Sequence, residues 1–149
     1  LVAEHYNVTV SKEKIVEGAR KAFIPGRFEQ VLPNVYLDGA HNPASAEKLV
    51  QTIQLLFPRE TIRFVVGMLK DKDCKKVLEN FEQVSDEFYF VNFANDRAID
   101  AKKLYDLSIA SKKEVIEDCS SFIQSCSKLK GITIVTGSLY LLAEIRNQL

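Results

Sequence analysis

Apolar residues follow two different spacings along the chain, and the alternation between them predicts its secondary structure. Short, almost wholly apolar runs such as TIRFVVGML (61–69) are typical of strands buried on both faces of a sheet. Segments such as PASAEKLVQTIQLLF (43–57) carry apolar residues three or four positions apart, which is typical of amphipathic helices. The expected strands are 27–32, 35–38, 61–69, 87–93, 114–117 and 132–137, and the expected helices are 11–22, 43–57, 73–84, 101–110, 119–129 and 138–149.

The repeated order of a buried strand followed by a helix predicts the fold class. Such a pattern indicates a mostly parallel sheet with helices on both faces. Pro33 and Asn34 form a tight turn between the first two strands, so these strands are expected to pair antiparallel. The expected fold is an α/β, Rossmann-like three-layer sandwich, with a mostly parallel sheet of about six strands and one antiparallel strand. Ligands of such sheets bind outside the carboxyl ends of the strands, so the turns that follow the strands are the places to search for chemistry.

The first notable turn is DGAHNP (38–43), which joins a strand to a helix. Asp38 closes the strand, and Gly39 allows the backbone to turn tightly or to approach a ligand. The free N–H groups and positive dipole of the following helix favour an anion. A carboxylate here can bind ribose hydroxyls, and the imidazole of His41 can bind a phosphate oxygen. The alternatives are that Asp38 caps the helix and that His41 is a surface loop residue.

The second notable turn is Thr136-Gly137-Ser138, which also joins a buried strand to a helix. Ser138 is a suitable N-cap, and plain capping is a sufficient explanation of the residue taken by itself. Both turns are nevertheless expected at the same edge of the sheet. Together they could bind two anionic groups side by side.

Composition excludes several classes of protein. The chain has 20 Lys and Arg against 20 Asp and Glu, whereas an unspecific nucleic-acid binder needs a basic face that displaces phosphate counterions. A local basic pocket for a nucleotide stays open. No apolar run approaches the roughly 18 residues of a membrane span. The three cysteines form no CxxC pair, so we expect reduced, partly buried thiols and neither a disulfide framework nor a zinc site.

The usual signatures of a complete nucleotide site are missing from the sequence. It contains neither GxxxxGK[ST] nor GxGxxG, so it lacks a phosphate-binding loop of its own. No His, Cys and carboxylate cluster has the spacing of a metal site, and no metal ligand is expected. If a nucleotide binds to this chain, most of its phosphate contacts must come from elsewhere.

Three motifs give the sequence a clear resemblance to a known family. PGRFEQVLPNVYLDGAHNPASAEKL (25–49), VVGMLKDKD (65–73) and VTGSLYLLAEIR (135–146) occur in the order found there. They resemble the C-terminal domain of the folylpolyglutamate synthase/dihydrofolate synthase family, within the Mur ligase superfamily. The resemblance implies a C-terminal glutamate-ligase domain over 25–149. It also implies that 1–24 are the linker and last helix of a preceding ATPase domain. The chain opens with Leu1 and no initiator methionine, so it is expected to be an excised domain or a processed product.

The resemblance implies an ATP-dependent amide ligase. Enzymes of this family use ATP to convert a carboxylate of dihydropteroate or of a folate glutamate tail into an acyl phosphate, which the amine of L-glutamate then attacks. Their central domain carries the P-loop, most of the Mg²⁺ ligands and the folate-binding surface, and the C-terminal domain closes over ATP and brings glutamate. The isolated chain is therefore expected to be inactive. The protein is expected to be a cytoplasmic monomer that binds neither nucleic acid nor membrane. Its expected partner is its own ATPase domain.

The resemblance also assigns roles to four residues. Arg27 is similar to the arginine that contacts ATP from across the domain interface, and Asp38 to the acid that binds the ribose. His41 is similar to the residue that positions the γ-phosphate and the incoming glutamate, and is expected to bind both and to act in catalysis. Ser138 is similar to the serine that helps to hold glutamate and is likewise expected in the catalytic set. Family-like positions without an assigned role are Asp71, Lys72 and Arg97.

Two other functions are open at this point. One is a different amino-acid ligase of the superfamily, such as one acting on peptidoglycan precursors. The motif DGAHNP favours the folate branch, since the precursor ligases more often have a tyrosine after the aspartate and a threonine before the proline. The other is a stand-alone binding or receiver module, but VGMLKD and VNFAND do not supply the acidic cluster that receivers need. The sequence leaves open whether the ligase has one activity or both, and which chain length it prefers.

Overall fold

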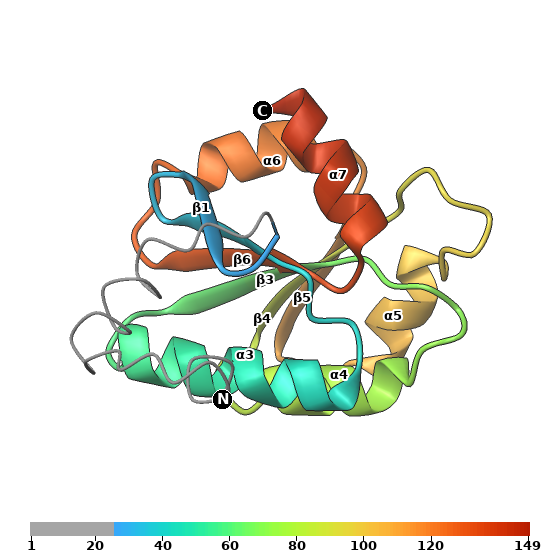
Figure 1. Cartoon of the computed structure of the whole chain (residues 1–149), viewed down its shortest axis with the longest axis horizontal. Coiled ribbons are helices and arrows are strands. Elements are labelled where there is room, and N and C mark those ends of the chain that lie inside the picture. The colour runs from blue at the N-terminus through green and yellow to red at the C-terminus, as the bar shows by residue number, and fades with distance from the viewer. Residues whose placement is uncertain (1–25) are drawn as a thin grey trace, which may run out of the picture.

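The computed structural model describes residues 26–149. The helix expected at 11–22 and the linker expected over 1–24 lie outside this range. The described residues form six strands and five helices (Figure 1). The strands are β1 (Glu29–Leu32), β2 (Val35–Asp38), β3 (Ile62–Val66), β4 (Glu87–Val91), β5 (Lys112–Ile116) and β6 (Ile132–Thr136). The helices are α3 (Pro43–Leu56), α4 (Cys74–Phe81), α5 (Ala101–Leu107), α6 (Cys119–Cys126) and α7 (Leu139–Gln148).

The six strands form one sheet in the order β1-β2-β6-β3-β4-β5. The β1–β2 pair is antiparallel, and every other neighbouring pair is parallel. Asn34 has φ of +61° in the tight turn between β1 and β2, a conformation that asparagine tolerates. The expected α/β sandwich with one antiparallel strand is confirmed. β2 and β6 lie side by side, which brings the two notable turns together.

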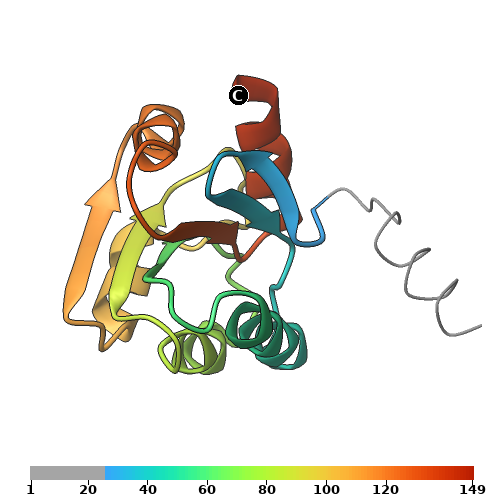
Figure 2. The same cartoon turned by 90° about the vertical axis from the view of Figure 1, so that its left-hand side faces the viewer.

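Helices cover both faces of the sheet. Helices α3, α4 and α5 pack on one face, and α6 and α7 on the other (Figures 1 and 2). Alternate residues of each strand supply the two cores, so that Phe64 and Phe88 face α4 while Val65 and Tyr89 face the opposite side. Stacked rings of Phe81, Phe64 and Phe88, with centroids 4.7 and 5.2 Å apart, fill the first core. No helix among residues 26–149 has both the length and the hydropathy needed to cross a membrane.

Two strands, β3 and β5, differ most from their expected ranges. β3 was expected to reach residue 69 but ends at Val66, because the backbone of residues 68–70 leaves the sheet and bonds to residues 97–99. β5 begins at Lys112, two residues earlier than expected. It is an edge strand, and its exposed side chains allow charged residues that apolar periodicity does not recognise.

The cysteines are free thiols, as expected. Cys74 and Cys126 are buried, and Cys119 is half-buried at the start of α6. Burial, with a smaller effect of the Glu144 charge, raises the pKa of Cys119 to about 12. The Cys119 thiol is therefore protonated at neutral pH and is a poor nucleophile.

An ion cluster around the buried Glu87 carboxylate lies at the amino ends of the strands, away from the two notable turns. Glu87 Oε1 accepts hydrogen bonds from Arg63 Nε at 2.8 Å, Lys112 Nζ at 2.8 Å and the Tyr89 hydroxyl at 2.9 Å. Arg63 Nη1 also donates to Thr133 Oγ1 at 3.2 Å. Burial by itself would raise the pKa of Glu87, but the bonds from Lys112, Arg63 and Tyr89 hold this pKa below its ordinary value. The cluster links four adjacent strands.

We expect the substitution Glu87→Gln to lower the free energy of unfolding by about 3 kcal/mol at pH 7, because it leaves the buried Arg63 without a counter-charge. The lowered pKa means that the carboxylate stabilises the fold above its ordinary pKa of 4.5 and that this contribution is lost as pH falls through the folded value. Urea unfolding should therefore show the gap between parent and variant shrinking towards pH ~3.

A matched control is Glu114→Gln, which changes an exposed glutamate of β5. We expect it to alter stability by less than about 0.5 kcal/mol at either pH. A gap between parent and Glu87→Gln that widened in acid would contradict the assignment of a lowered pKa to Glu87.

Candidate functional site

The turns after β2 and β6 are joined by two hydrogen bonds to one carbonyl. Gly137 N donates to the Ala40 carbonyl at 3.0 Å, and Thr136 Oγ1 donates to the same oxygen at 3.1 Å. Both Ala40 and Thr136 are fully buried. The two turns are therefore held against each other, and the expectation that they share an edge of the sheet is confirmed.

Glycine is required where these turns approach their neighbours. Gly137 has φ of +104°, and a Cβ at this position would lie 2.6 Å from the Gly67 carbonyl oxygen at the end of β3. A Cβ at Gly39 would lie 2.5 Å from the Leu139 side chain. Because neither glycine has a side chain, the ends of the neighbouring strands β2, β6 and β3 and the start of α7 can lie close together.

His41 is held by the backbone of its own turn. Its Nδ1 lies 2.8 Å from the Gly39 carbonyl, which can only accept, so Nδ1 carries a proton. The Asn42 side-chain nitrogen lies 3.5 Å from Nε2, the other ring nitrogen. Asn42, not Asp38, is the N-cap of α3, and it forms a capping box with Ser45. The alternative that Asp38 caps this helix is therefore wrong.

Ser138 both caps a helix and faces the site. Its Oγ accepts a hydrogen bond from Tyr140 N at 3.2 Å and it is the N-cap of α7. It is 2% exposed, yet it lines a surface hollow together with His41. Capping therefore accounts for the residue type without excluding contact with a ligand.

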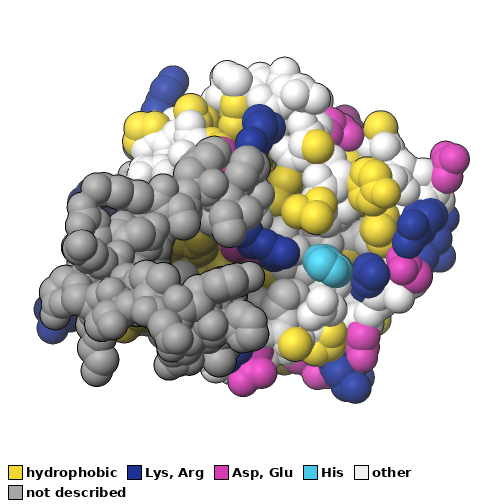
Figure 3. All heavy atoms as spheres, in the orientation of Figure 1, with side chains coloured by type: hydrophobic (Ala, Val, Ile, Leu, Met, Phe, Trp, Pro, Cys, Tyr) yellow, Lys and Arg dark blue, Asp and Glu magenta, His cyan; other side chains and the backbone are white. Residues whose placement is uncertain are grey.

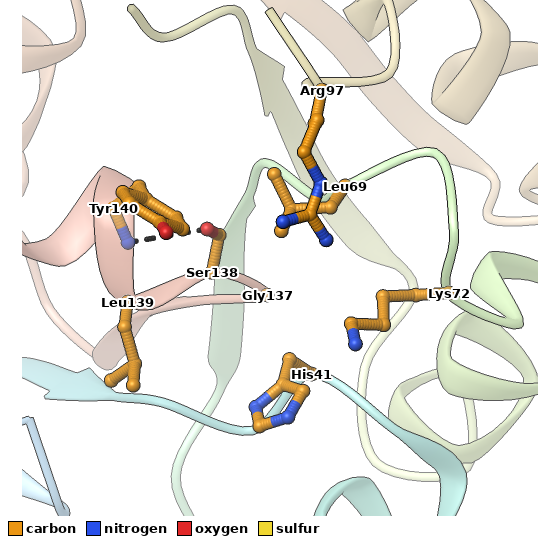
Figure 4. A pocket seen from close by; sticks show the side chains of 8 residues that line it. All are labelled: His41, Leu69, Lys72, Arg97, Gly137, Ser138, Leu139 and Tyr140. Atoms are coloured by element: carbon orange, nitrogen blue, oxygen red, sulfur yellow. Dashed lines mark hydrogen bonds between the residues drawn. The ribbon is translucent and has the colours of Figure 1, made fainter. Parts of the chain in front are cut away.

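A hollow of about 220 Å³ lies over the ends of β2, β3 and β6. In Figure 4 His41, Lys72 and Arg97 point into it from three different loops, opposite Ser138 and Tyr140. Figure 3 shows Lys or Arg side chains on either side of the histidine on this face. None of the described residues that line the hollow is acidic. The lining residues are His41, Leu69, Lys72, Arg97, Gly137, Ser138, Leu139 and Tyr140.

Asp71 aligns the two cations of the hollow from outside it. Its Oδ2 lies 3.0 Å from Arg97 Nη2 and 3.3 Å from Lys72 Nζ. The hydrogen bond from Arg97, with a smaller effect of that from Lys72, lowers the pKa of Asp71. The three residues are solvent-accessible, so a ligand carboxylate or phosphate can compete for the same cations.

Asp38 lies outside this hollow and joins two turns. Its Oδ2 accepts from Phe28 N and its Oδ1 from Ala40 N, each at 2.9 Å. Burial raises the pKa of Asp38, against the lowering effect of both bonds and of the Arg27 charge. Phe28 has φ of +46°, so the carboxylate holds a residue in a conformation that it would otherwise rarely adopt.

The structure thus divides the four residues selected from the sequence into two pairs. His41 and Ser138 share the hollow. Arg27 is exposed on the turn that Asp38 braces. Sequence reasoning could not place Lys72 and Arg97 in one site, and it missed Tyr140, although TGSLY was one of the motifs. Among residues 26–149 no group of three or more His, Cys, Asp or Glu side chains is arranged to hold a metal ion.

Comparison with known proteins identifies the family of this chain. The family model of the Mur ligase glutamate ligase domain matches residues 26–139. The dihydrofolate synthase/folylpolyglutamate synthase of Bacillus subtilis (strain 168) is 39% identical over 145 residues, which cover 94% of this chain and 34% of that protein. The chain thus spans about a third of the length of this relative.

Solved structures of similar proteins share the fold. A crystal structure of folylpolyglutamate synthase from Thermotoga maritima is 33% identical with a TM-score of 0.77, covering 97% of this chain and 35% of that one. The bifunctional folylpolyglutamate synthase/dihydrofolate synthase from Yersinia pestis, complexed with AMPPNP and Mn ion, is 29% identical with a TM-score of 0.79, covering 94% and 35%. The region that the family model matches includes both turns and every lining residue of the hollow except Tyr140. This chain therefore belongs to the Mur ligase family, as a glutamate ligase domain.

Proposed function

We propose that this chain is the C-terminal domain of an ATP-dependent ligase that adds L-glutamate to a folate or to dihydropteroate, with the basic hollow as the glutamate site. The observation that carries the proposal is the convergence of His41, Lys72 and Arg97 with the Ser138 hydroxyl around a hollow without an acidic lining residue. A dicarboxylate needs two cationic contacts, and the guanidinium of Arg97 can bind one carboxylate through two hydrogen bonds.

The chemistry explains why such a site is useful. A carboxylate is a poor electrophile until one of its oxygens is phosphorylated, after which an amine can displace the phosphate and form an amide. Cations that hold both carboxylates of glutamate leave its amine free to attack and hold it in line with the acyl phosphate. His41 lies between the hollow and the N-terminus of α3, where an anion is favoured. It is therefore suited to contact both glutamate and the terminal phosphate.

The second pair of residues is suited to ATP. Arg27 is exposed, and in this proposal it reaches a phosphate group across a domain interface. Each oxygen of Asp38 accepts one backbone hydrogen bond and keeps a second lone pair for a ribose hydroxyl. Mg²⁺, when bound, neutralises charge on the phosphates. Since the described residues offer no metal cluster, its ligands in this proposal come from the central domain.

The proposal extends to the rest of the enzyme. Residues 1–24 serve as the linker and last helix of the preceding ATPase domain, which carries the P-loop and the folate surface. The ligase works in the cytoplasm as a monomer, and its C-terminal domain closes over ATP with glutamate bound. The named relatives and the nucleotide complex of the Yersinia pestis protein support this assignment.

The test of the proposed function follows ADP release by the complete enzyme that contains this chain. Mg-ATP is supplied with dihydropteroate or with a reduced folate, each with and without L-glutamate. We expect ADP release that requires glutamate, and the preferred acceptor distinguishes a single from a double activity. ADP release that does not depend on glutamate, or that requires a different amino acid, would overturn the proposal.

We expect His41→Ala to lower kcat by about 10²-fold, as is typical when a group that stabilises the reacting centre is removed. Folate binding should change by less than about twofold, because His41 lies in the hollow and not on the folate surface. Steady-state kinetics and folate titration measure the two effects separately. Lost folate affinity with unchanged kcat would show that this role is wrong.

The glycines at the two ends of β6 provide a further test. Gly131 has φ of +87° and Gly137 of +104°, and a Cβ at either would lie 2.6 Å from a backbone oxygen. Gly131→Ala and Gly137→Ala should each cost about 1–3 kcal/mol of stability. Only Gly137→Ala should also raise the KM for glutamate, because only Gly137 lines the hollow. Equal effects of both variants on this KM would count against the hollow as the glutamate site.

A further inference from the structure

Helix α7 makes polar contacts on two sides, one with the loop that follows β4 and one with the first residue of β1. Glu144 bonds to the loop that carries Arg97, and Arg146 pairs with Glu29, beside the turn that carries Arg27. We propose that Glu144 and Arg146 are positioning residues, which align the two arginines from a single helix. The inference rests on the proposed function only for the assignment of Arg97 to glutamate and of Arg27 to ATP.

The loop that carries Arg97 is anchored at both ends. At its far end, Lys70 N donates to the Arg97 carbonyl at 2.8 Å, and Ile99 N donates to the Met68 carbonyl at 2.9 Å. At its near end, Ala94 N donates to Glu144 Oε2 at 2.9 Å. Without the contact from Glu144, the first half of the loop would lose its hydrogen bond to α7 and would keep only the packing of Phe93 in the core that this residue shares with α7. Asp71 holds the guanidinium itself, and we expect the backbone that carries it to keep its position through both anchors.

The turn that carries Arg27 is anchored in a similar way. Glu29 Oε2 accepts a hydrogen bond from Gly26 N at 2.9 Å, and it also pairs with the Arg146 guanidinium. Gly26 packs on α7, since a Cβ at this glycine would lie 3.4 Å from the Leu142 side chain. The Gly26 carbonyl accepts from Gly39 N at 2.7 Å, which completes the connection to the turn after β2.

The geometry of α7 explains how one helix contacts both the loop of Arg97 and the segment beside the turn of Arg27. Glu144 and Arg146 are two residues apart, which is about 200° around a helix, so they point to opposite flanks. Ile145 between them is buried against the sheet, as are Leu141 and Leu142. Figure 2 shows α7 beside the β1–β2 hairpin. Because the apolar side is fixed to the core, the two flanks cannot shift independently.

This arrangement predicts separate kinetic effects of the two anchors. In the complete enzyme, Glu144→Ala should raise the KM for glutamate by about tenfold and leave the KM for ATP within about twofold. Arg146→Ala should do the reverse. Glu144→Gln should stay close to the parent, since an amide oxygen still accepts from Ala94 N, and Arg146→Lys should restore part of the ATP affinity.

Matched controls are Glu47→Ala and Arg59→Ala, which remove exposed charges of the same type away from α7. Both should leave the two KM values unchanged. Equal changes of both KM values in Glu144→Ala or in Arg146→Ala would overturn the inference, since that result indicates a general loss of structure. Equal effects of Glu144→Gln and Glu144→Ala would also overturn it.

Hydrogen exchange distinguishes failure of this inference from failure of the proposed function. In Glu144→Ala, amides of residues 94–98 should exchange faster, while amides of β6 stay protected. This readout needs no activity. If the parent enzyme shows no glutamate-dependent ADP release, the proposed function fails and the exchange data still test the anchor. Unchanged exchange in 94–98 would overturn the anchoring role of Glu144.

Discussion

The buried carbonyl of Ala40 is the point on which the site depends. It accepts hydrogen bonds from Gly137 N and Thr136 Oγ1, and so ties the turn after β2 to the turn after β6. An unpaired buried carbonyl is costly, so the two turns are unfavourable apart and stable together. His41 and Ser138 follow these bonded residues closely in the sequence. Their place in one hollow is thus a consequence of backbone geometry, which side-chain substitutions elsewhere do not readily disturb.

Charge is distributed unevenly around this fixed point. The whole sequence has a formal charge of zero, yet the lining of the hollow includes Lys72, Arg97 and His41 and no acid among the described residues. Asp71 pairs with both Lys72 and Arg97 from outside, which limits their mutual repulsion before an anion arrives. A ligand carboxylate would then replace the Asp71 carboxylate as the partner of these two cations. Because the cations are solvent-accessible, the cost of desolvating them is small.

Sequence reasoning worked where a local pattern decides the structure. Apolar periodicity located every described strand and helix, and turn chemistry identified the DGAHNP and TGS turns. It failed where contacts join distant segments. Arg97 meets Lys72 because residues 97–99 pair with the backbone of 68–70 beyond the end of β3, and no local pattern records that pairing. Arg63 lies within a strand that was expected to be almost wholly apolar. Its partner Glu87 is 24 positions away, so no local pattern predicts the ion pair.

Asp38 is a second residue whose role depends on contacts between distant segments. A carboxylate at a strand end suggests either a cap or a ligand contact, but here it first stabilises the positive φ of Phe28 and fixes the turn of Arg27. Its bond to Ala40 N also links that turn to the residue whose carbonyl joins β2 to β6. The two parts of the site therefore share one residue, Ala40, through its N–H on one side and its carbonyl on the other. The turn of Arg27 and the turn after β6 are thus connected through the two peptide groups that flank the Ala40 Cα. We expect a distortion of one turn to affect the other.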